Sequence, residues 1–308
     1  MKEGRQQLSE ELDKVEVLST SSVMVRLMHA PLRYLCGQFF NKVIYPITKK
    51  EKVVRAFTFF GVEMKVALPA GSDLLFTHGK SHDSELRLVR FLLREVKEGS
   101  QFLDIGAHFG YFTLLAARLT GPTGKVCSYE PGKHTYAVLS QNVSGNAVIN
   151  TFNRAVSSEN TKLEFYEFPA YYSEYNTMDV SQFEQESWFA RYKPEKIIVD
   201  AETIDSITSD GSIIPQFIKI DVEGAEDRVI AGGRNYFKDN NPIVIMEYVS
   251  ITRNNGNHKK AIEYLLSFGF SMAIIRKDGS IDDMDPKKLD EYLESHGLES
   301  DNIVFRKV

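Results

Sequence analysis

The sequence predicts an α/β fold in which strands and helices alternate around a mainly parallel sheet. Short apolar runs, several of them ending in an acidic residue, are followed by segments whose apolar residues recur at helical spacing. The clearest unit starts at Phe102, passes through a turn between Gly106 and Gly110, and continues as a helical pattern to Leu119. Because a strand, a helix and a second strand in succession usually place both strands parallel, we expect helices on both faces of the sheet.

Length and composition fit one large domain with an N-terminal extension. The chain has 308 residues, of which 43% are apolar, enough to bury a full α/β core. We expect a helical extension over residues 1–55 and the main domain over residues 56–308. The net charge of −5 argues against nucleic-acid binding, because proteins that follow a phosphate backbone carry a basic surplus. Two cysteines, no apolar run of about 18 residues and a charged N-terminus unlike a secretory signal predict a cytoplasmic protein without disulfides.

The N-terminal extension combines a helical pattern with basic charge. Residues 8–55 look mostly helical, with interruptions at Pro31 and Pro46. From Met24 to Arg55 the apolar residues are Leu27, Met28, Leu32, Leu35, Phe39, Phe40, Val43, Ile44 and Tyr45, and the basic ones are Arg26, Arg33, Lys42, Lys49, Lys50, Lys52 and Arg55. Such a segment either lies on an anionic membrane surface or packs as a helical layer on the main domain or on a second subunit. We favour the packed layer, which leaves peripheral membrane contact and a homo-oligomer as alternatives.

The elements before the glycine turn are a hairpin, a loop and a helix. Residues 57–68 read as two short strands around Gly61, and residues 73–84 as a loop that carries two histidines. A helix over residues 84–97 has Glu85 in its first turn.

Further strands and helices follow the glycine turn. Strands are expected near residues 125–131, 148–152, 162–168, 197–199, 217–226, 243–248, 270–276 and 302–306, and helices near 259–267 and 286–295. An insertion at about 165–200 is rich in tyrosine, tryptophan and phenylalanine and has no clear periodicity. It is either a lid over a substrate or a surface excursion whose aromatic side chains pack together.

The glycine turn and the acid after the next strand indicate a nucleoside without phosphates. The pattern from Asp104 to Gly110 is D-x-G-x-x-x-G, which differs from the G-x-G-x-x-G of dinucleotide enzymes. Glu130 ends the second strand, near the spacing at which a carboxylate accepts hydrogen bonds from ribose hydroxyls.

Five blocks resemble the FkbM family of S-adenosylmethionine-dependent methyltransferases. They are residues 104–113, 129–131, 203–207, 219–226 and 301–305, in the family's order, and the resemblance covers roughly residues 55–308. It implies a class I methyltransferase (Rossmann-like) fold, with a seven-stranded mainly parallel sheet whose last strand is antiparallel. It also implies methyl transfer from S-adenosylmethionine, usually to oxygen. One position departs from the family's Gly-Ala-Asn turn, because His108 stands where asparagine is usual.

The resemblance also implies which residues hold the cofactor. These are Glu85, Asp104, Gly106, Ala107, His108, Gly110, Tyr111, Phe112, Glu130, Pro131, Asn153, Ala155 and Asp221. Asp104 and the turn after it would contact the methionine portion, Glu130 the ribose, and residues 153–156 the adenine. Glu85 would reach the amino group, or would only stabilise the start of its helix.

Methyl transfer to a hydroxyl needs a group that removes a proton. Asp221, at the end of the fourth strand, is the first candidate for the catalytic base, Glu223 the second and His108 the third. His78 and His82 have the right unperturbed pKa but stand in a loop, where histidines are usually solvated. Lys219 and Glu226 would brace the loop.

Three classes of function follow from these residues. The first is O-methylation of a sugar, glycan, lipid-linked or secondary-metabolite acceptor. We expect it to need no metal, although Asp221 and Glu247 at neighbouring strand ends could hold Mg²⁺. An oxidoreductase is the second class, disfavoured by the glycine pattern. A non-catalytic descendant that docks on a membrane or a partner through its N-terminal region is the third.

Overall fold

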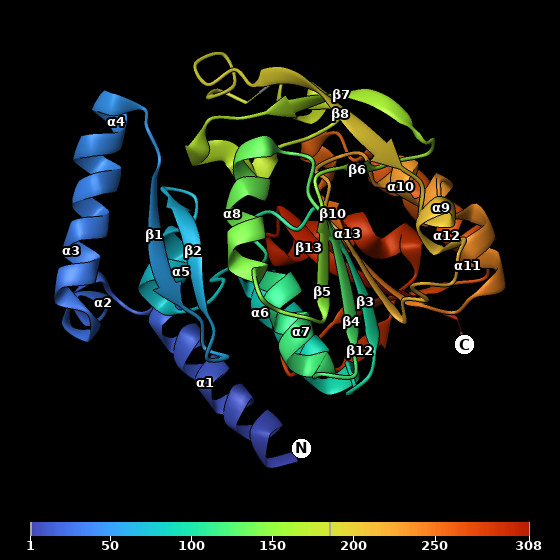
Figure 1. Cartoon of the computed structure of the whole chain (residues 1–308), viewed down its shortest axis with the longest axis horizontal. Coiled ribbons are helices and arrows are strands. Elements are labelled where there is room, and N and C mark those ends of the chain that lie inside the picture. The colour runs from blue at the N-terminus through green and yellow to red at the C-terminus, as the bar shows by residue number, and fades with distance from the viewer. Residues whose placement is uncertain (1, 185, 308) are drawn as a thin grey trace.

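The structure is a computed structural model that describes residues 2–184 and 186–307. A large sheet lies at its centre, a smaller sheet lies over one end of it, and the N-terminal helices stand to one side (Figure 1). None of the described helices is long and apolar enough to cross a membrane.

The central sheet has eight strands in the order β12-β11-β13-β10-β9-β3-β4-β5. Their bounds are β3 (Gln101–Ile105), β4 (Lys125–Tyr129), β5 (Ile149–Phe152), β9 (Phe217–Ile220), β10 (Ile243–Val249), β11 (Ser271–Ile275), β12 (Ile281–Asp283) and β13 (Ser300–Arg306). The five strands from β5 to β10 are parallel, and the last strand, β13, runs antiparallel to both of its neighbours. The predicted fold class is confirmed. The sheet has one strand more than expected because the short β12 pairs with β11 in a hairpin.

Helices cover both faces of this sheet. They are α6 (Asp83–Glu95), α7 (Tyr111–Thr120), α8 (Lys133–Val143), α9 (Ile204–Thr208), α10 (Glu226–Ala231), α11 (Arg234–Asp239), α12 (Gly256–Ser267) and α13 (Leu289–His296), with short turns η4 (Ile251–Arg253) and η5 (Pro286–Lys288). Neighbouring side chains of β3 enter opposite cores, because successive residues of a strand point to opposite faces. Phe102 packs in the cluster that includes Leu115 of α7, and Leu103 in the cluster that includes Leu265 of α12.

The aromatic insertion belongs to a second, three-stranded sheet. Its strands are β6 (Ala155–Val156), β7 (Thr161–Glu167) and β8 (Glu195–Glu202), in the order β6-β8-β7, and the turns η2 (Ala170–Tyr175) and η3 (Val180–Phe183) lie between β7 and β8. This sheet crosses above the main one (Figure 1). It brings the insertion over the carboxyl ends of the central strands. Residues 173–176 of the insertion line a cavity together with residues at these strand ends.

The N-terminal region is a chain of helices followed by a hairpin. Its elements are α1 (Lys2–Thr20), α2 (Val23–His29), α3 (Pro31–Phe39), the π-helix η1 (Phe40–Ile44), α4 (Tyr45–Thr48), β1 (Lys52–Phe57), β2 (Glu63–Leu68) and α5 (Ser72–Thr77). Leu12 and Val15 of α1 are buried in the main core, so this helix is part of the packed body. Pro31 lies in the first turn of α3, where a missing N–H removes no helical bond, and Pro46 lies in α4, which follows the π-helix η1 directly.

Two predicted boundaries in this region are wrong. The helices end at Thr48, and β1 begins at Lys52, because the β-branched pair Val53-Val54 favours a strand and pairs in register with β2. The segment predicted as a loop over residues 73–84 starts as the helix α5, whose Leu74 and Leu75 are buried.

Candidate functional site

A cavity of about 590 Å³ lies at the carboxyl ends of β3, β4, β9 and β10. Most of the residues predicted for the site line it together, namely Glu85, Asp104, Gly106, Ala107, His108, Tyr111, Phe112, Glu130, Pro131, Ala155, Asp221, Glu223 and Glu247. They come from six separate stretches of the chain. The fold therefore gathers at one place the residues that the sequence suggests for cofactor binding and for catalysis.

Gly106 joins the end of β3 to the end of β9 by backbone contact. Its φ of +82° lies in the left-handed region, and an added Cβ would lie only 1.7 Å from the carbonyl oxygen of Asp221. The N–H groups of Gly106 and Ala107 both donate to the carbonyl oxygen of Tyr129, at 2.9 and 3.1 Å. Only glycine fits where three strand ends approach this closely.

Glu130 ties the glycine turn to the loop after β4. Its buried carboxylate accepts hydrogen bonds from the backbone N–H groups of His108 and Gly132, at 2.8 and 2.9 Å, and from Oγ1 of Thr135 at 2.7 Å. Burial raises the pKa of Glu130 to about 7, although these hydrogen bonds oppose the rise. A carboxylate has about four lone-pair positions, so one remains for a donor in the cavity.

Gly110 and Asn153, predicted to contact the cofactor, do not line the cavity. Gly110 has a φ of +89° and precedes α7, where an added Cβ would lie 2.5 Å from Cδ1 of Leu139. Asn153 donates from Nδ2 to the carbonyl oxygens of Glu130 and Pro131, at 2.9 and 3.0 Å. Both residues therefore support the residues that line the cavity. Gly110 allows the turn before α7, and the side-chain amide of Asn153 donates to backbone carbonyl oxygens.

The backbone conformation at position 108 accounts for a histidine there better than a role as catalytic base does. Its φ is +50°, a region that asparagine and histidine enter more readily than most residues, so the residue type suits the turn despite the departure from the family pattern. Its Nε2 lies 3.0 Å from Oγ of Ser173. Burial lowers the pKa of His108 to about 4, which makes the ring a weak base at neutral pH.

The other two histidine candidates separate in the structure. His82 lines the cavity. His78 does not, since its Nδ1 lies 2.8 Å from the carbonyl oxygen of Phe57 and its ring packs edge-on against His29. His78 thus contacts the N-terminal helix α2 and not the cavity.

Charged groups alternate across the ends of β3 and β9. Asp104 is fully buried, and its Oδ2 accepts a hydrogen bond from Oγ1 of Thr113 at 2.6 Å, whereas its Oδ1 has no protein partner among the described residues. Lys219 donates from Nζ to Oδ2 of Asp221 at 2.8 Å. Burial raises the pKa of Asp104, and the ammonium of Lys219 partly opposes this.

Three carboxylates meet at the ends of β9 and β10. One oxygen from each of Asp221, Glu223 and Glu247 lies within 4.8 Å of the others. Glu223 faces Arg253 at 3.5 Å and Gln182 at 3.4 Å, while Oε2 of Glu247 is buried without a hydrogen-bond partner in the described chain. Burial and neighbouring carboxylates raise the pKa of Glu223 well above its usual range and that of Glu247 to about 7. This side of the cavity therefore holds acids that are ready to carry a proton.

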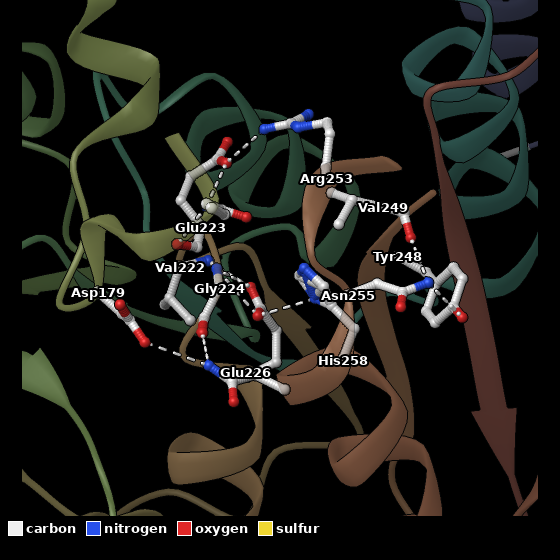
Figure 2. A network of polar contacts seen from close by, with 12 residues as sticks. Asp179, Val222, Glu223, Gly224, Glu226, Tyr248, Val249, Arg253, Asn255 and His258 are labelled. Atoms are coloured by element: carbon white, nitrogen blue, oxygen red, sulfur yellow. Dashed lines mark hydrogen bonds and ion pairs between the residues drawn. The ribbon is translucent and has the colours of Figure 1, made fainter. Parts of the chain in front are cut away.

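A buried network supports the loop that carries these acids (Figure 2). Glu223 and Gly224 both have a positive φ, of +54° and +99°. The carboxyl group of Glu226 accepts from the N–H groups of Gly224 and Val222, and its Oε2 lies 3.0 Å from Nδ1 of His258. Burial raises the pKa of Glu226 to about 7 and lowers that of His258 to about 4, so both groups are neutral between these values. Glu226 thus lies behind the acidic loop as a brace.

A second charged cluster was not foreseen from the sequence. Lys80 lies 3.3 Å from Oε1 of Glu85 and 2.6 Å from Oε1 of Glu174, and all three line the cavity together with Arg253. Glu85 leaves its Oε2 without a partner among the described residues. Lys80, Glu174 and Arg253 come from loops far apart in the sequence and carry no motif, so no signal identified them.

The aromatic insertion combines the two predicted roles. Tyr172 stacks on Trp188 with ring centres 4.1 Å apart, and Phe168 packs edge-on against the same indole, so much of the aromatic surface is covered by other rings. Residues 173–176, however, line the cavity. The insertion is a self-packed unit that presents one edge to the site.

Comparison with known proteins gives one family match. The family model described as "Methyltransferase FkbM domain" matches residues 104–272, which is more than half of the chain. The matched stretch runs from the acid before the glycine turn to β11 and includes the acidic loop and β10. No curated protein matches the sequence significantly.

Solved structures show weak likenesses. A methyltransferase FkbM from Methylobacillus flagellatus is 15% identical, with a TM-score of 0.41, over 68% of this chain and 44% of that chain, so this chain spans less than half of that protein. A fibrillarin from Aeropyrum pernix, crystallised with natively bound S-adenosyl-L-methionine, is 14% identical with a TM-score of 0.38, over 71% and 74% of the two chains. A segment named StiE O-MT is 13% identical with a TM-score of 0.40, over 78% and 77%.

Proposed function

This chain belongs to the FkbM family of S-adenosylmethionine-dependent methyltransferases, and we propose that it methylates a hydroxyl oxygen. Its fold is the class I methyltransferase fold, and its cofactor is S-adenosylmethionine. The observation that supports oxygen as the target is the position of an unpartnered carboxylate, Glu247, in the same cavity as the glycine turn and Glu130.

The residues on one side of the cavity fit the cofactor. Oδ1 of Asp104 and Oε2 of Glu85 are buried acceptors without a protein partner among the described residues, and Glu130 keeps one position for a donor. An ammonium group and two ribose hydroxyls supply donors of this kind. When bound, S-adenosylmethionine provides a methyl group on a positively charged sulfur. The protein contributes acceptors that orient the cofactor and a glycine turn that lets it come close to the backbone.

The acidic side of the cavity would take the acceptor's proton. We assign the general base to Glu247, because its Oε2 has no hydrogen-bond partner among the described residues, and its pKa, raised by burial to about 7, suits a base at neutral pH. Asp221 is held by Lys219 at 2.8 Å, which suits it to orient the hydroxyl. Glu223 is paired with Arg253, and burial and neighbouring carboxylates raise its pKa well above its usual range, which favours its protonated form.

The acceptor class that we propose is a hydroxyl-bearing sugar, glycan, lipid-linked molecule or secondary metabolite. The support is the polar lining of the cavity beyond the acids, which includes Lys80, Arg253, Ser300 and Asn302. Such groups suit a ligand that carries several hydroxyls.

Calorimetric titration tests the cofactor half of this proposal. We expect micromolar binding of S-adenosylmethionine, no binding of NAD, and at least about tenfold weaker binding after Glu130→Ala, because that change removes the ribose acceptor and three hydrogen bonds of the turn. Glu167→Ala is the control, since Glu167 is also buried and accepts from a backbone N–H but does not line the cavity. Binding of NAD instead of S-adenosylmethionine would contradict the proposal.

Product analysis tests the choice of oxygen. Screening hydroxyl-bearing acceptors with methyl-labelled cofactor should yield an O-methyl product, identified by mass spectrometry and NMR. Methyl transfer only to nitrogen or carbon would show that the acids serve another purpose.

A second candidate mechanism uses Mg²⁺ on the three carboxylates. It is favoured by the convergence of Asp221, Glu223 and Glu247 oxygens within 4.8 Å, because Mg²⁺ prefers oxygen ligands and acidifies a bound hydroxyl. Activity that disappears with a chelator and returns with Mg²⁺ would support it. Activity unchanged by the chelator would support the general base alone.

A further inference from the structure

The helices from α2 to α4 leave an apolar face without a protein partner in the described chain. We call residues 23–50 the basic arm. Its large apolar side chains with 41–79% of their surface exposed are Val23, Met24, Val25, Met28, Leu32, Leu35, Phe39, Val43 and Ile47. In Figure 1 these helices stand at the edge of the molecule, beside the β1–β2 hairpin. Contiguous apolar surface of this kind marks an interaction site rather than an ordinary protein surface.

The exposed residues of the second half of the arm form one stripe. From Leu32 to Ile47 they recur every three or four positions, so they share one side of the helix, and the stripe is about 22 Å long at 1.5 Å per residue. The opposite side carries Tyr34, Phe40 and Tyr45, which are buried against the hairpin and α5. The arm is thus attached to the domain by one side and exposes the other.

The charge of the arm is opposite to that of the rest of the protein. Residues 17–50 contain no aspartate or glutamate and have five basic residues, Arg26, Arg33, Lys42, Lys49 and Lys50. The remainder, with 32 basic and 42 acidic residues, has a net charge of −10. Apolar side chains flanked by lysine and arginine suit the surface of an anionic bilayer, where the apolar groups enter the headgroup boundary and the cations meet lipid phosphates.

We propose that the basic arm docks this protein on the surface of an anionic lipid bilayer. A second copy of the chain is the less suitable occupant. In a two-fold dimer the same patch meets itself, which would place the lysines and arginines of one arm against those of the other. A bilayer supplies the missing negative charge.

The arm also contacts the aromatic insertion, other residues of which line the cavity. The hydroxyl oxygen of Tyr45 accepts from the backbone N–H of Tyr171 at 3.2 Å, and Nζ of Lys49 donates to the hydroxyl of Tyr192 at 3.2 Å. Both tyrosines belong to the aromatic insertion, whose residues 173–176 line the cavity. This step rests on the proposed function. Because the arm that docks on the bilayer contacts the insertion beside the cavity, lipid-linked molecules are the favoured members of the proposed acceptor class.

Vesicle flotation of the full chain tests the docking. We expect it to float with phosphatidylcholine vesicles that contain phosphatidylglycerol, not with pure phosphatidylcholine, and to be released by added salt, which screens the attraction. Leu32→Ser with Ile47→Ser, and separately Lys42→Glu with Lys50→Glu, should each weaken binding about tenfold or more. The matched controls are Ile198→Ser with Ile214→Ser and Lys287→Glu with Lys288→Glu, which change exposed residues elsewhere and should bind as the wild type does.

Three results would overturn the proposal. The first is wild-type protein that does not float with anionic vesicles, and the second is arm variants that float as well as the controls. The third is a dimer in solution that the Leu32→Ser, Ile47→Ser variant converts to a monomer, which would make this face a subunit interface. Because flotation needs neither cofactor nor acceptor, its result is independent of the methyltransferase proposal.

Discussion

The two sides of the cavity differ in how their acidic groups are held. On the cofactor side, Glu130 accepts three hydrogen bonds, and Gly106 packs directly against the backbone of Asp221. On the acidic side, Glu247 has an oxygen without a partner, and Glu223 is held in a left-handed conformation. The first side is a backbone scaffold that also keeps two acceptors without a protein partner among the described residues, Oδ1 of Asp104 and Oε2 of Glu85, for the donors of the cofactor. The second side brings three carboxylates within 4.8 Å of one another, and their raised pKa values suit proton transfer.

Forcing the backbones of Gly106 and Asp221 apart should disrupt the scaffold and cause the largest effect. Gly106→Ala adds a Cβ 1.7 Å from the Asp221 carbonyl oxygen at a φ of +82°, and we expect about 3–5 kcal/mol lower free energy of unfolding and loss of cofactor binding. Gly145→Ala is the matched control, because Gly145 has a φ of +80° but nothing within 4 Å. It should cost only about 1–2 kcal/mol. Equal losses in chemical denaturation would show that the strand ends can move apart.

Neutralising the free acid should affect catalysis and spare binding. Glu247→Gln removes the proposed base, so kcat should fall about 10²–10⁴-fold while the Kd for S-adenosylmethionine stays unchanged. In the wild type, kcat should rise as the pH passes about 7, because burial and the Asp221 carboxylate raise the pKa of Glu247 to about 7, and the base must be ionised. Glu223→Gln should cause a smaller loss, because that carboxyl group already faces Arg253 and Gln182. A larger loss of kcat for Glu223→Gln than for Glu247→Gln would show that Glu223 is the base and Glu247 the supporting acid.

The brace behind the acidic loop gives the smallest expected effect. The pKa of Glu226 is raised by burial to about 7, so the stability of its neutral form is complete below the ordinary glutamate pKa and is lost as the pH rises through about 7. Glu226→Gln keeps a neutral group at this position at every pH. Its free energy of unfolding should therefore increase relative to that of the wild type by about 2–3 kcal/mol as the pH is raised from about 5 to about 8. Thermal or urea unfolding at the two pH values measures this, with the exposed Glu294→Gln as control. A constant difference would mean that Glu226 is ionised throughout.

The same division explains what the sequence could predict. The cofactor side is built from a continuous stretch between Asp104 and Pro131, where strand, turn and helix are local and each residue type has a local reason. The predicted alternation of strands and helices was right for the same reason. In contrast, Glu85 pairs with Lys80, which also pairs with Glu174, and Glu223 pairs with Arg253. These contacts form only through tertiary packing, and no spacing reveals them.

Local reasoning could not foresee what packing does to individual side chains. Asn153 has the residue type and position of an adenine contact, yet its amide is used by two backbone carbonyl groups. His108 has the ordinary chemistry of a base, but burial lowers its pKa to about 4. For the basic arm, the favoured packed layer describes only one side of the helices. Tyr34 packs inward, whereas Leu32, two residues earlier, is largely exposed.

The contact between Tyr45 of the arm and Tyr171 of the insertion has a kinetic consequence. An enzyme that stays on a bilayer through its arm, with the wall of its cavity attached to that arm, meets lipid-linked acceptors by diffusion in two dimensions. Its turnover would then follow the mole fraction of the acceptor in the bilayer rather than its bulk concentration. Diluting the acceptor with inert lipid at a constant total amount would slow the reaction.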